Sequence, residues 1–318
     1  MLHNIRKKII FMGTPSFAVP ALEAISAGPY DIAAVYTQPD REAGRGKRVT
    51  TSPVKQTALA HGLPVKQPEK LRNPDVIATL RGYAPDVIVV AAYGLMIPKE
   101  ILALPHCGCV NIHPSLLPLY RGASPVSTAI LKGDAATGVT IMLLDEGMDT
   151  GPILAQIEIP ISAADTTGTL TDTLAGVGAR LLFETLPHWL SGEIKPQPQD
   201  NRRAVNTRQV SKDDGQIDWS ISAAELWCQI RAYNPWPGSY TRWLGKRLRI
   251  DAAGLGITAD PVEPGRVVSV QRDGATHIGV GTGDGILELL RVQLEGKKVV
   301  SIRDFVQGHR EFIGSRLD

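Results

Sequence analysis

The chain has 318 residues, of which 43% are hydrophobic and 21% are charged, and its formal net charge is +2. This length leaves room for two domains with sizeable hydrophobic cores, and the near-neutral charge by itself indicates no nucleic-acid or membrane partner. No apolar run approaches the ~18 residues that a membrane-spanning helix needs, so we expect a cytoplasmic protein. The three cysteines imply no disulfide framework, and Cys107 and Cys109 lack a second ligand pair, so we expect no metal.

The first half of the chain alternates predicted strands and helices. We expect strands at 8–12, 32–37 and 86–92, because short apolar runs there are typical of buried strands, and a helix after the first strand, with Ser16 as its N-cap. This order predicts an α/β fold with a doubly wound, mostly parallel sheet of the Rossmann-like class. The turn Gly13-Thr-Pro has a single glycine and lacks the G-x-G-x-x-G pattern, so we exclude a dinucleotide site.

A further buried strand is predicted to end in Asn111-Ile-His113, just before Pro114. Since side chains alternate along a strand, Asn111 and His113 should point to the same side, at the carboxyl edge where open α/β sheets bind ligands. An amide can donate to the oxygen of a carbonyl under attack, and an imidazole can exchange a proton near neutral pH, so the pair suits acyl transfer to an amine. For such a pair alone, the preferred interpretation would be two polar residues that bind turn backbone.

The continuation of this strand is more specific. Residues 111–122 read Asn-Ile-His-Pro-Ser-Leu-Leu-Pro-Leu-Tyr-Arg-Gly, which resembles the signature of the formyltransferases that use 10-formyltetrahydrofolate. The resemblance implies that Asn111 and His113 are catalytic and that Asp149, in Leu-Leu-Asp-Glu-Gly-Met-Asp-Thr-Gly-Pro, completes the set. It also implies a folate pocket with an apolar slot for the pterin ring. Its residues would be Ser115, Leu116, Leu117 and Pro118, together with Gly94, Leu95, Met96 and Ile97.

Residues 38–55 are predicted to form a basic loop, with five basic residues and a single acid from Arg41 to Lys55. Such a loop is either solvated surface or a site that meets the phosphates of a nucleic acid, and composition favours neither. Its sequence resembles an insertion in the members of that family that formylate methionyl-tRNA, apart from Glu42. The resemblance implies that the following residues contact initiator methionyl-tRNA: Arg41, Arg45, Lys47 and Arg48.

The polar, proline-containing tract 191–208 is typical of an interdomain linker. It separates a predicted formyltransferase catalytic domain, 1–190, from a predicted C-terminal domain, 209–318. In the latter, Ser222 and Glu225 predict a capping box that opens a helix.

After this helix, short apolar runs that alternate with glycine turns predict a small antiparallel β-barrel, with strands expected at 248–250, 265–270, 276–280, 285–290 and 290–294. For Trp236 and Tyr240, packing in the core is a safer expectation than stacking on a nucleotide. The resembled formyltransferases carry a C-terminal barrel similar to an oligonucleotide-binding fold, which implies that this domain binds tRNA.

The resemblance implies transfer of a formyl group from 10-formyltetrahydrofolate to the amino group of methionyl-initiator tRNA. One alternative is a formyltransferase that acts on an amino-sugar nucleotide or on glycinamide ribotide; the basic loop and the second module favour the RNA substrate. Another is a non-catalytic RNA-binding relative, against which the intact Asn111, His113 and Asp149 argue. We expect a monomer that binds the folate co-substrate and tRNA and no membrane.

Overall fold

The structure is a computed structural model that describes residues 6–43, 48–257, 262–272 and 274–318. Its contacts divide the chain into two compact units. Unit 1 comprises 1–125, 136–160 and 171–207, and unit 2 comprises 126–135, 161–170 and 208–318. The domain boundaries 1–190, 191–208 and 209–318 remain a prediction.

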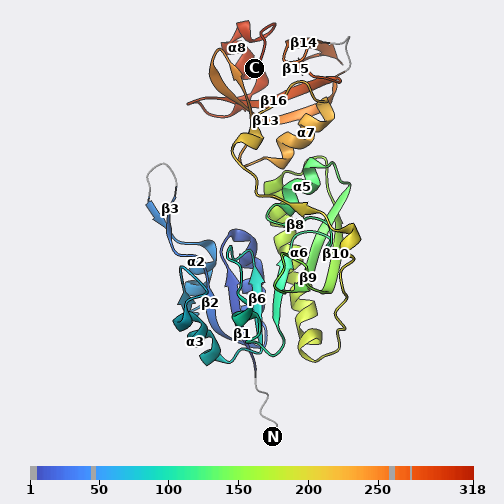
Figure 1. Cartoon of the computed structure of the whole chain (residues 1–318). Helices are drawn as coiled ribbons and strands as arrows, with labels where there is room; N and C mark the ends of the chain where they lie inside the picture. Colours follow the sequence, from blue (N-terminus) through green and yellow to red (C-terminus); the bar gives the residue numbers. More distant parts are fainter. Residues whose placement is uncertain (1–5, 44–47, 258–261, 273) are drawn as a thin grey trace. The chain divides into compact units, whose positions relative to one another are not determined.

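Unit 1 is built around a seven-stranded sheet with the order β10-β9-β7-β6-β1-β2-β5 (Figure 1). Its strands are β1 (Lys7–Gly13), β2 (Tyr30–Tyr36), β5 (Val65–Lys66), β6 (Val87–Ala91), β7 (Cys109–His113), β9 (Ala136–Leu143) and β10 (Ile153–Pro160). Strands β7, β6, β1, β2 and β5 run parallel, whereas β9 is antiparallel to both β7 and β10. The strand order reverses between β1 and β6, the kind of switch point at which such sheets bind ligands. The predicted doubly wound, mostly parallel class is confirmed.

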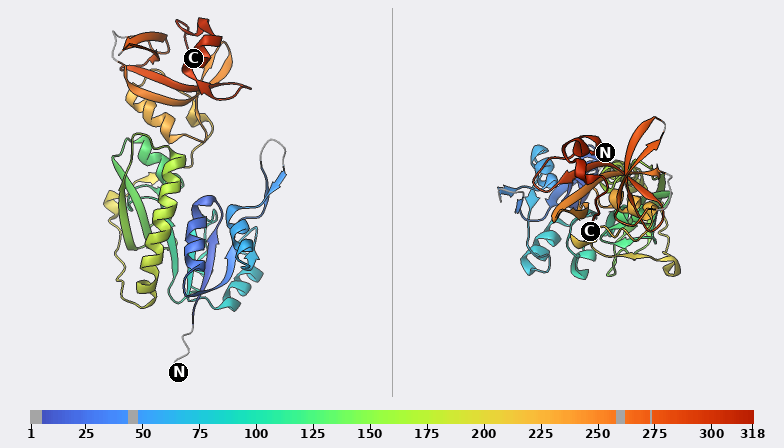
Figure 2. Two further views of the ribbon diagram at one scale, coloured as in Figure 1. Left: turned by 180° about the vertical axis from the view of Figure 1, so that it is seen from behind. Right: turned by 90° about the horizontal axis from the view of Figure 1, so that it is seen from above.

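Helices cover both faces of this sheet, because its central strands are apolar on both sides. On one face, α3 (Pro74–Tyr83) contributes Leu80 to a core that contains alternate strand residues such as Ile10 and Ile88. On the other face lies α6 (Thr167–Leu190), the yellow-green helix that runs lengthwise along the strands in the left view of Figure 2. A Cβ added to Gly178 of α6 would lie 2.8 Å from the side chain of Ile112, so the helix packs tightly against β7.

Two local predictions in unit 1 need correction. Ser16 does not cap the first helix, because a 3-10 turn precedes α1 (Val19–Ser26), whose N-cap residue Ala18 makes no side-chain cap bond. The predicted basic loop contains a hairpin of two antiparallel strands, β3 (Arg41–Ala43) and β4 (Arg48–Thr50). The hairpin leads to α2 (Pro53–Ala60), which Ser52 caps by accepting from the N–H of Lys55.

Unit 2 contains a six-stranded antiparallel sheet with the order β12-β13-β16-β15-β14, and β17 pairs with β16. Its strands are β12 (Ser239–Trp243), β13 (Lys246–Ile257), β14 (Val267–Arg272), β15 (Ala275–Gly281), β16 (Ile286–Leu294) and β17 (Val300–Ser301). Two apolar runs that were expected as separate strands, 285–290 and 290–294, belong to the single strand β16. The predicted capping box of Ser222 and Glu225 is confirmed at the start of α7 (Ala223–Ala232).

The segment 314–318 joins the two edges of this sheet. At the β14 edge, the N–H of Gly314 donates to Val267, whose own N–H donates to Ser315. At the β12 edge, Arg242 and Asp318 exchange two backbone hydrogen bonds of 3.1 Å. The segment therefore completes the barrel that was predicted from the spacing of the apolar runs, since pairing of both edges leaves neither strand open.

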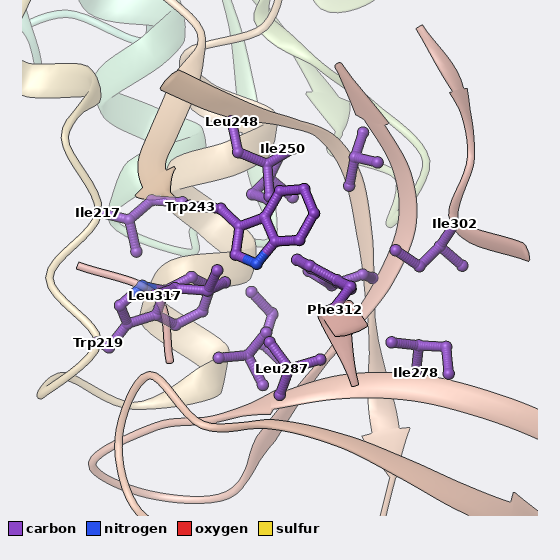
Figure 3. Close-up of a cluster of buried hydrophobic side chains, with 14 of the residues drawn as sticks. Ile217, Trp219, Trp243, Leu248, Ile250, Ile278, Leu287, Ile302, Phe312 and Leu317 are labelled. Carbon is purple, nitrogen blue, oxygen red and sulfur yellow. The ribbon is translucent and has the colours of Figure 1, made fainter. Parts of the chain in front are cut away.

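The core of unit 2 is a cluster of buried apolar side chains inside this barrel (Figure 3). The indole of Trp243 lies among Phe305 of α8 (Ile302–Gly308) and Phe312, with ring centroids 5.6 and 5.3 Å away in edge-to-face geometry. Such pairs stabilise a core beyond the area that they bury. In the described part of the chain, no helix is long and apolar enough to cross a membrane.

Candidate active site

Asn111 and His113 lie at the carboxyl end of β7 and are 8% and 4% exposed. They share the face of β7 opposite Ile112, which α6 covers, because successive side chains on a strand point to opposite sides. Within the described residues the Asn111 amide has no hydrogen-bond partner. A nearly buried amide without a protein partner is free to donate to a substrate oxygen.

The imidazole of His113 contacts two groups. Its Nε2–H donates to the carbonyl oxygen of Tyr120 at 3.0 Å, and because a carbonyl cannot donate, this nitrogen must carry the proton. Its Nδ1 faces the carboxylate of Asp149 at 3.6 Å. Burial lowers the pKa of His113, while the charge of Asp149 and the carbonyl of Tyr120 oppose that change. Since Nε2 carries a proton, Nδ1 is the ring atom that can take up a second one, and the Asp149 carboxylate faces it.

Asp149 reaches His113 from the loop between β9 and β10. Its Oδ2 accepts from the N–H of Gly122 at 2.8 Å, which fixes the carboxylate beside the ring. Asp149 and Tyr120 both have left-handed backbone, with φ of 54° and 60°. This conformation is unfavourable for residues with a side chain, by about 1–3 kcal/mol each, and residues held in it cluster at functional sites. Of the three acids in this loop, Asp149 is thus the one that the structure places against the histidine.

The other acids in the loop have different surroundings. The carboxylate of Asp145 accepts from the N–H of Gly147 at 3.0 Å and from the hydroxyl of Thr150 at 2.6 Å. These bonds shape the turn that carries Asp149. Glu146 lines a pocket described below.

The predicted wall of the folate pocket, 115–118, is a turn packed on β9 and β10. Ser115 is fully buried and its hydroxyl donates to the carbonyl of Leu119 at 2.6 Å. The N–H of Leu117 donates to Thr140, and the amide of Gln156 donates to the carbonyl of Leu117 at 2.9 Å. Leu116 is the partly exposed member of the turn and Pro118 is buried. The turn is therefore held by several protein contacts and can form a rigid wall.

The second predicted folate segment, Gly94 to Ile97, follows β6. Gly94 is exposed with φ of 90°, a conformation that favours glycine. Met96, 63% exposed, and Ile97 line a pocket of about 420 Å³. The remaining lining residues of this pocket are Arg72, Pro98, Lys99, Glu100 and Glu146. Met96, Ile97 and Pro98 give the pocket an apolar side, whereas the other four lining residues are charged.

The basic hairpin is described only in part. Arg41 is exposed and its Nη2 donates to the Gln38 amide oxygen at 3.4 Å. Arg45 and Lys47 lie outside the described residues, as does the side chain of Arg48. The base of the hairpin is held by Asp40, which accepts from the Lys55 ammonium at 2.5 Å and from the Gln67 amide at 2.8 Å. These two bonds lower the pKa of Asp40.

In unit 2, the two aromatic residues singled out in the sequence have different surroundings. Trp236 is 53% exposed and so does not belong to the core. Tyr240 is partly buried, and the guanidinium of Arg247 lies 3.5 Å above its ring. The expectation of core packing is therefore wrong for Trp236.

The site also contains a residue that sequence reasoning missed. Gln199, from the tract that was predicted as a linker, bonds to the side chain of Arg121 and to the backbone of Asp149. No local pattern indicates this role, since the partners are far apart in the sequence. Within the described residues, no group of three or more histidine, cysteine, aspartate or glutamate side chains is arranged to hold a metal ion.

The chain is similar to known proteins over most of its length. A family model described as formyl transferase matches residues 7–186, and one described as formyl transferase, C-terminal domain, matches residues 209–310. Similar curated proteins include a methionyl-tRNA formyltransferase of Chloroflexus aggregans, 51% identical over 92% of this chain and 94% of its own length. Another, from Myxococcus xanthus, is 47% identical over 98% of each chain.

Among solved structures, HypX from Aquifex aeolicus in complex with tetrahydrofolic acid is similar over 96% of this chain and 48% of that chain. The TM-score is 0.64 and the sequence identity 18%, so this likeness shows a shared fold. The two family matches and the relatives near 50% identity lead to one conclusion. The chain belongs to the formyl transferase family.

Proposed function

We propose that this protein transfers the formyl group of 10-formyltetrahydrofolate to the amino group of methionyl-initiator tRNA, in the cytoplasm. The observation that carries the proposal is that the Asn111 amide and the paired His113 and Asp149 lie together at the carboxyl edge of the sheet. The choice of acceptor is supported by relatives of 44–51% identity that are named methionyl-tRNA formyltransferase.

In the proposed reaction, the folate supplies the formyl group and the neutral amine of the methionyl ester attacks the formyl carbon. Negative charge develops on the formyl oxygen, and the Asn111 amide donates a hydrogen bond to it. Removal of a single such donor typically slows an enzyme by about 10²–10³-fold. Holding amine and formyl carbon together contributes further, up to about 7–11 kcal/mol in the best-oriented cases.

His113 handles the proton in this proposal. Nδ1 of the neutral ring accepts the proton that the attacking nitrogen loses, directly or through water, and returns it to N10 as the bond between N10 and the formyl carbon breaks. The imidazolium formed between these steps is stabilised by the Asp149 carboxylate 3.6 Å away. Burial lowers the pKa of His113, which favours the neutral ring as the starting state of this step.

We assign folate binding to the turn Ser115 to Pro118 and to the segment Gly94 to Ile97. The first is rigid and mostly buried, and the second borders the 420 Å³ pocket. The residues Arg41, Arg45, Lys47 and Arg48 are proposed contacts to the tRNA, and the protein is proposed to act as a monomer. Arg45→Ala should then raise the KM for tRNA while the KM for the folate stays unchanged; an unchanged kcat/KM for tRNA would exclude this role.

A formylation assay tests the proposal. With 10-formyltetrahydrofolate as donor, formylation of methionyl-initiator tRNA is expected and formylation of a UDP-amino-sugar is not. His113→Ala should lower kcat by at least ~100-fold, as expected for the loss of a general acid–base group, while folate binding is retained. His106→Ala, at an exposed histidine, is the matched control. Formylation of the sugar alone, or near-normal turnover of the His113 variant, would contradict the proposal.

A further inference from the structure

Gln199 connects two parts of the chain that meet at the active site. Its Oε1 accepts from Nε and Nη2 of Arg121, at 3.0 and 2.8 Å. Its Nε2 donates to the carbonyl oxygens of Asp149 and Gly151, at 2.8 and 2.7 Å. The orientation of the amide is determined, because a guanidinium can only donate and a carbonyl can only accept.

Both ends of this connection control the position of Asp149. At one end, Gln199 bonds the backbone of Asp149 itself, where φ is 54° and the surroundings must hold the residue in place. At the other end, it bonds Arg121, and the next residue, Gly122, donates its N–H to the Asp149 carboxylate at 2.8 Å. The Gln199 side chain therefore ties the loop that carries Asp149 to the strand β8 (Arg121–Gly122) that binds its carboxylate.

The segment around Gln199 makes this tie rigid. Arg121 is 5% exposed, and its Nη2 also donates to the Asn201 amide oxygen at 2.8 Å. Further along the chain, β11 (Asn206–Thr207) pairs in parallel with β8 through two residue pairs. Residues 199–207 thus form one side of the active-site support in unit 1. They lie between the two ranges that the family models match.

We propose that Gln199 is a positioning residue that holds the Asp149 carboxylate against His113 during formyl transfer. This rests on the proposed function of the site. Gln199 touches no reacting atom and acts through Asp149, which among the described residues is the charged side chain facing His113. Without the tie, the loop relaxes, the carboxylate moves away and the imidazolium loses its stabilising charge.

Gln199→Met tests this role, because methionine keeps the side-chain length and carries no charge and no amide. We expect kcat to fall about 10–100-fold, since a displacement of about 1 Å at a catalytic group has effects of that order. The KM values for folate and tRNA should stay within about 3-fold, because Gln199 contacts neither substrate in this proposal. Gln197→Met is the matched control: the exposed Gln197 amide donates only to the carbonyl of Lys195 among the described residues, so its loss should leave kcat unchanged.

The same substitution in an Asp149→Asn background separates positioning from general stability. If Gln199 acts through Asp149, the second substitution should lower kcat by less than about 2-fold in that background, since coupled residues are not additive. A full additional loss, an unchanged kcat in the single variant, or an equal loss in Gln197→Met would overturn the proposal. Should Gln199→Met not fold, Gln199→Glu takes its place, because it keeps the oxygen that accepts from Arg121 and removes the donor to Asp149.

A readout without substrate keeps this test separate from the proposed function. The titration of His113, followed by NMR in the substrate-free protein, should show a lower pKa in Gln199→Met than in the parent protein, because the carboxylate that favours the imidazolium has moved away. An unchanged titration refutes the positioning role whatever the enzyme acts on. If the parent protein fails to formylate methionyl-tRNA while this pKa falls, the proposed function is wrong and the positioning role holds.

Discussion

The interaction of Asp149 with His113 makes a quantitative prediction for Asp149→Asn. The carboxylate oxygen lies 3.6 Å from Nδ1, and the two side chains are only 16% and 5% exposed. At an effective dielectric constant of about 20, a full charge pair at this separation is worth about 4–5 kcal/mol. Asparagine keeps the shape, accepts from Gly122 in the same way and tolerates the left-handed backbone, so the change removes mainly the charge.

If His113 carries the proton in the reaction, the barrier should rise by about 2–4 kcal/mol, because some of the interaction is replaced by the amide dipole and by water. This corresponds to a fall in kcat of about 30- to 1000-fold, measured by steady-state formylation of methionyl-tRNA. Glu158→Gln is the matched control, since it also removes one negative charge from unit 1, but from an exposed side chain on β10.

The direction in which the pH profile of Asp149→Asn shifts is a second test of the same reasoning. Without the carboxylate, the pKa of His113 falls further, because burial then acts without its main opponent. Since the neutral ring accepts the proton, the acid limb of the profile of kcat/KM against pH should move to lower pH. A shift of this limb to higher pH, or a kcat lowered by less than about 5-fold, would refute the reasoning that gives His113 and Asp149 these roles.

Two further predictions concern stability. Burial lowers the pKa of His113 in the folded state below its unfolded value of about 6.5. The unfolded chain therefore binds more protons than the folded one, and the free energy of unfolding should fall as pH drops through about 6.5. Urea unfolding at pH 7.5 and 5.5 should show a smaller pH effect for His113→Gln; equal effects would contradict the assignment. Gly122 has φ of 103°, and an added Cβ would lie 2.7 Å from the carbonyl oxygen of Thr207. Gly192 also has positive φ, 79°, but an added Cβ there would meet open space. Gly122→Ala should therefore destabilise unit 1 by more than Gly192→Ala. Gly122→Ala should also lower kcat, since its N–H holds Asp149, and thermal unfolding with steady-state kinetics on both variants checks this.

The local chemistry of the sequence was sufficient for several features of the fold. The spacing of Asn111 and His113 placed both on one face of a strand, because side chains alternate with a period of two. The capping box of Ser222 and Glu225 started α7 as predicted, because its two hydrogen bonds involve residues within a single turn. Such features depend on neighbours in the chain and can therefore be predicted from it.

Other features depended on contacts between distant residues. The apolar runs 285–290 and 290–294 were expected as two strands, but they form the single strand β16. Backbone pairing with β13 along the whole of β16 decides where that strand ends, and the local sequence does not show this pairing. The 3-10 turn before α1 displaced the expected cap at Ser16, and the exposure of Trp236 followed from how unit 2 packs. Neither had a local signal, because both depend on what the rest of the chain places beside these residues.

The sequence by itself determined the kinds of groups at the candidate active site, and the tertiary structure decided how they are held. The resemblance singled out Asp149 among three acids, but its 3.6 Å approach to His113 depends on a backbone bond to Gly122 from another loop. Gln199 came from a tract whose composition suggested only a linker, because hydrogen bonds to Arg121 and Asp149 leave no periodic trace in the sequence. Residue type and spacing encode local geometry, whereas the precise placement of charges arises only when segments far apart in the chain fold against one another.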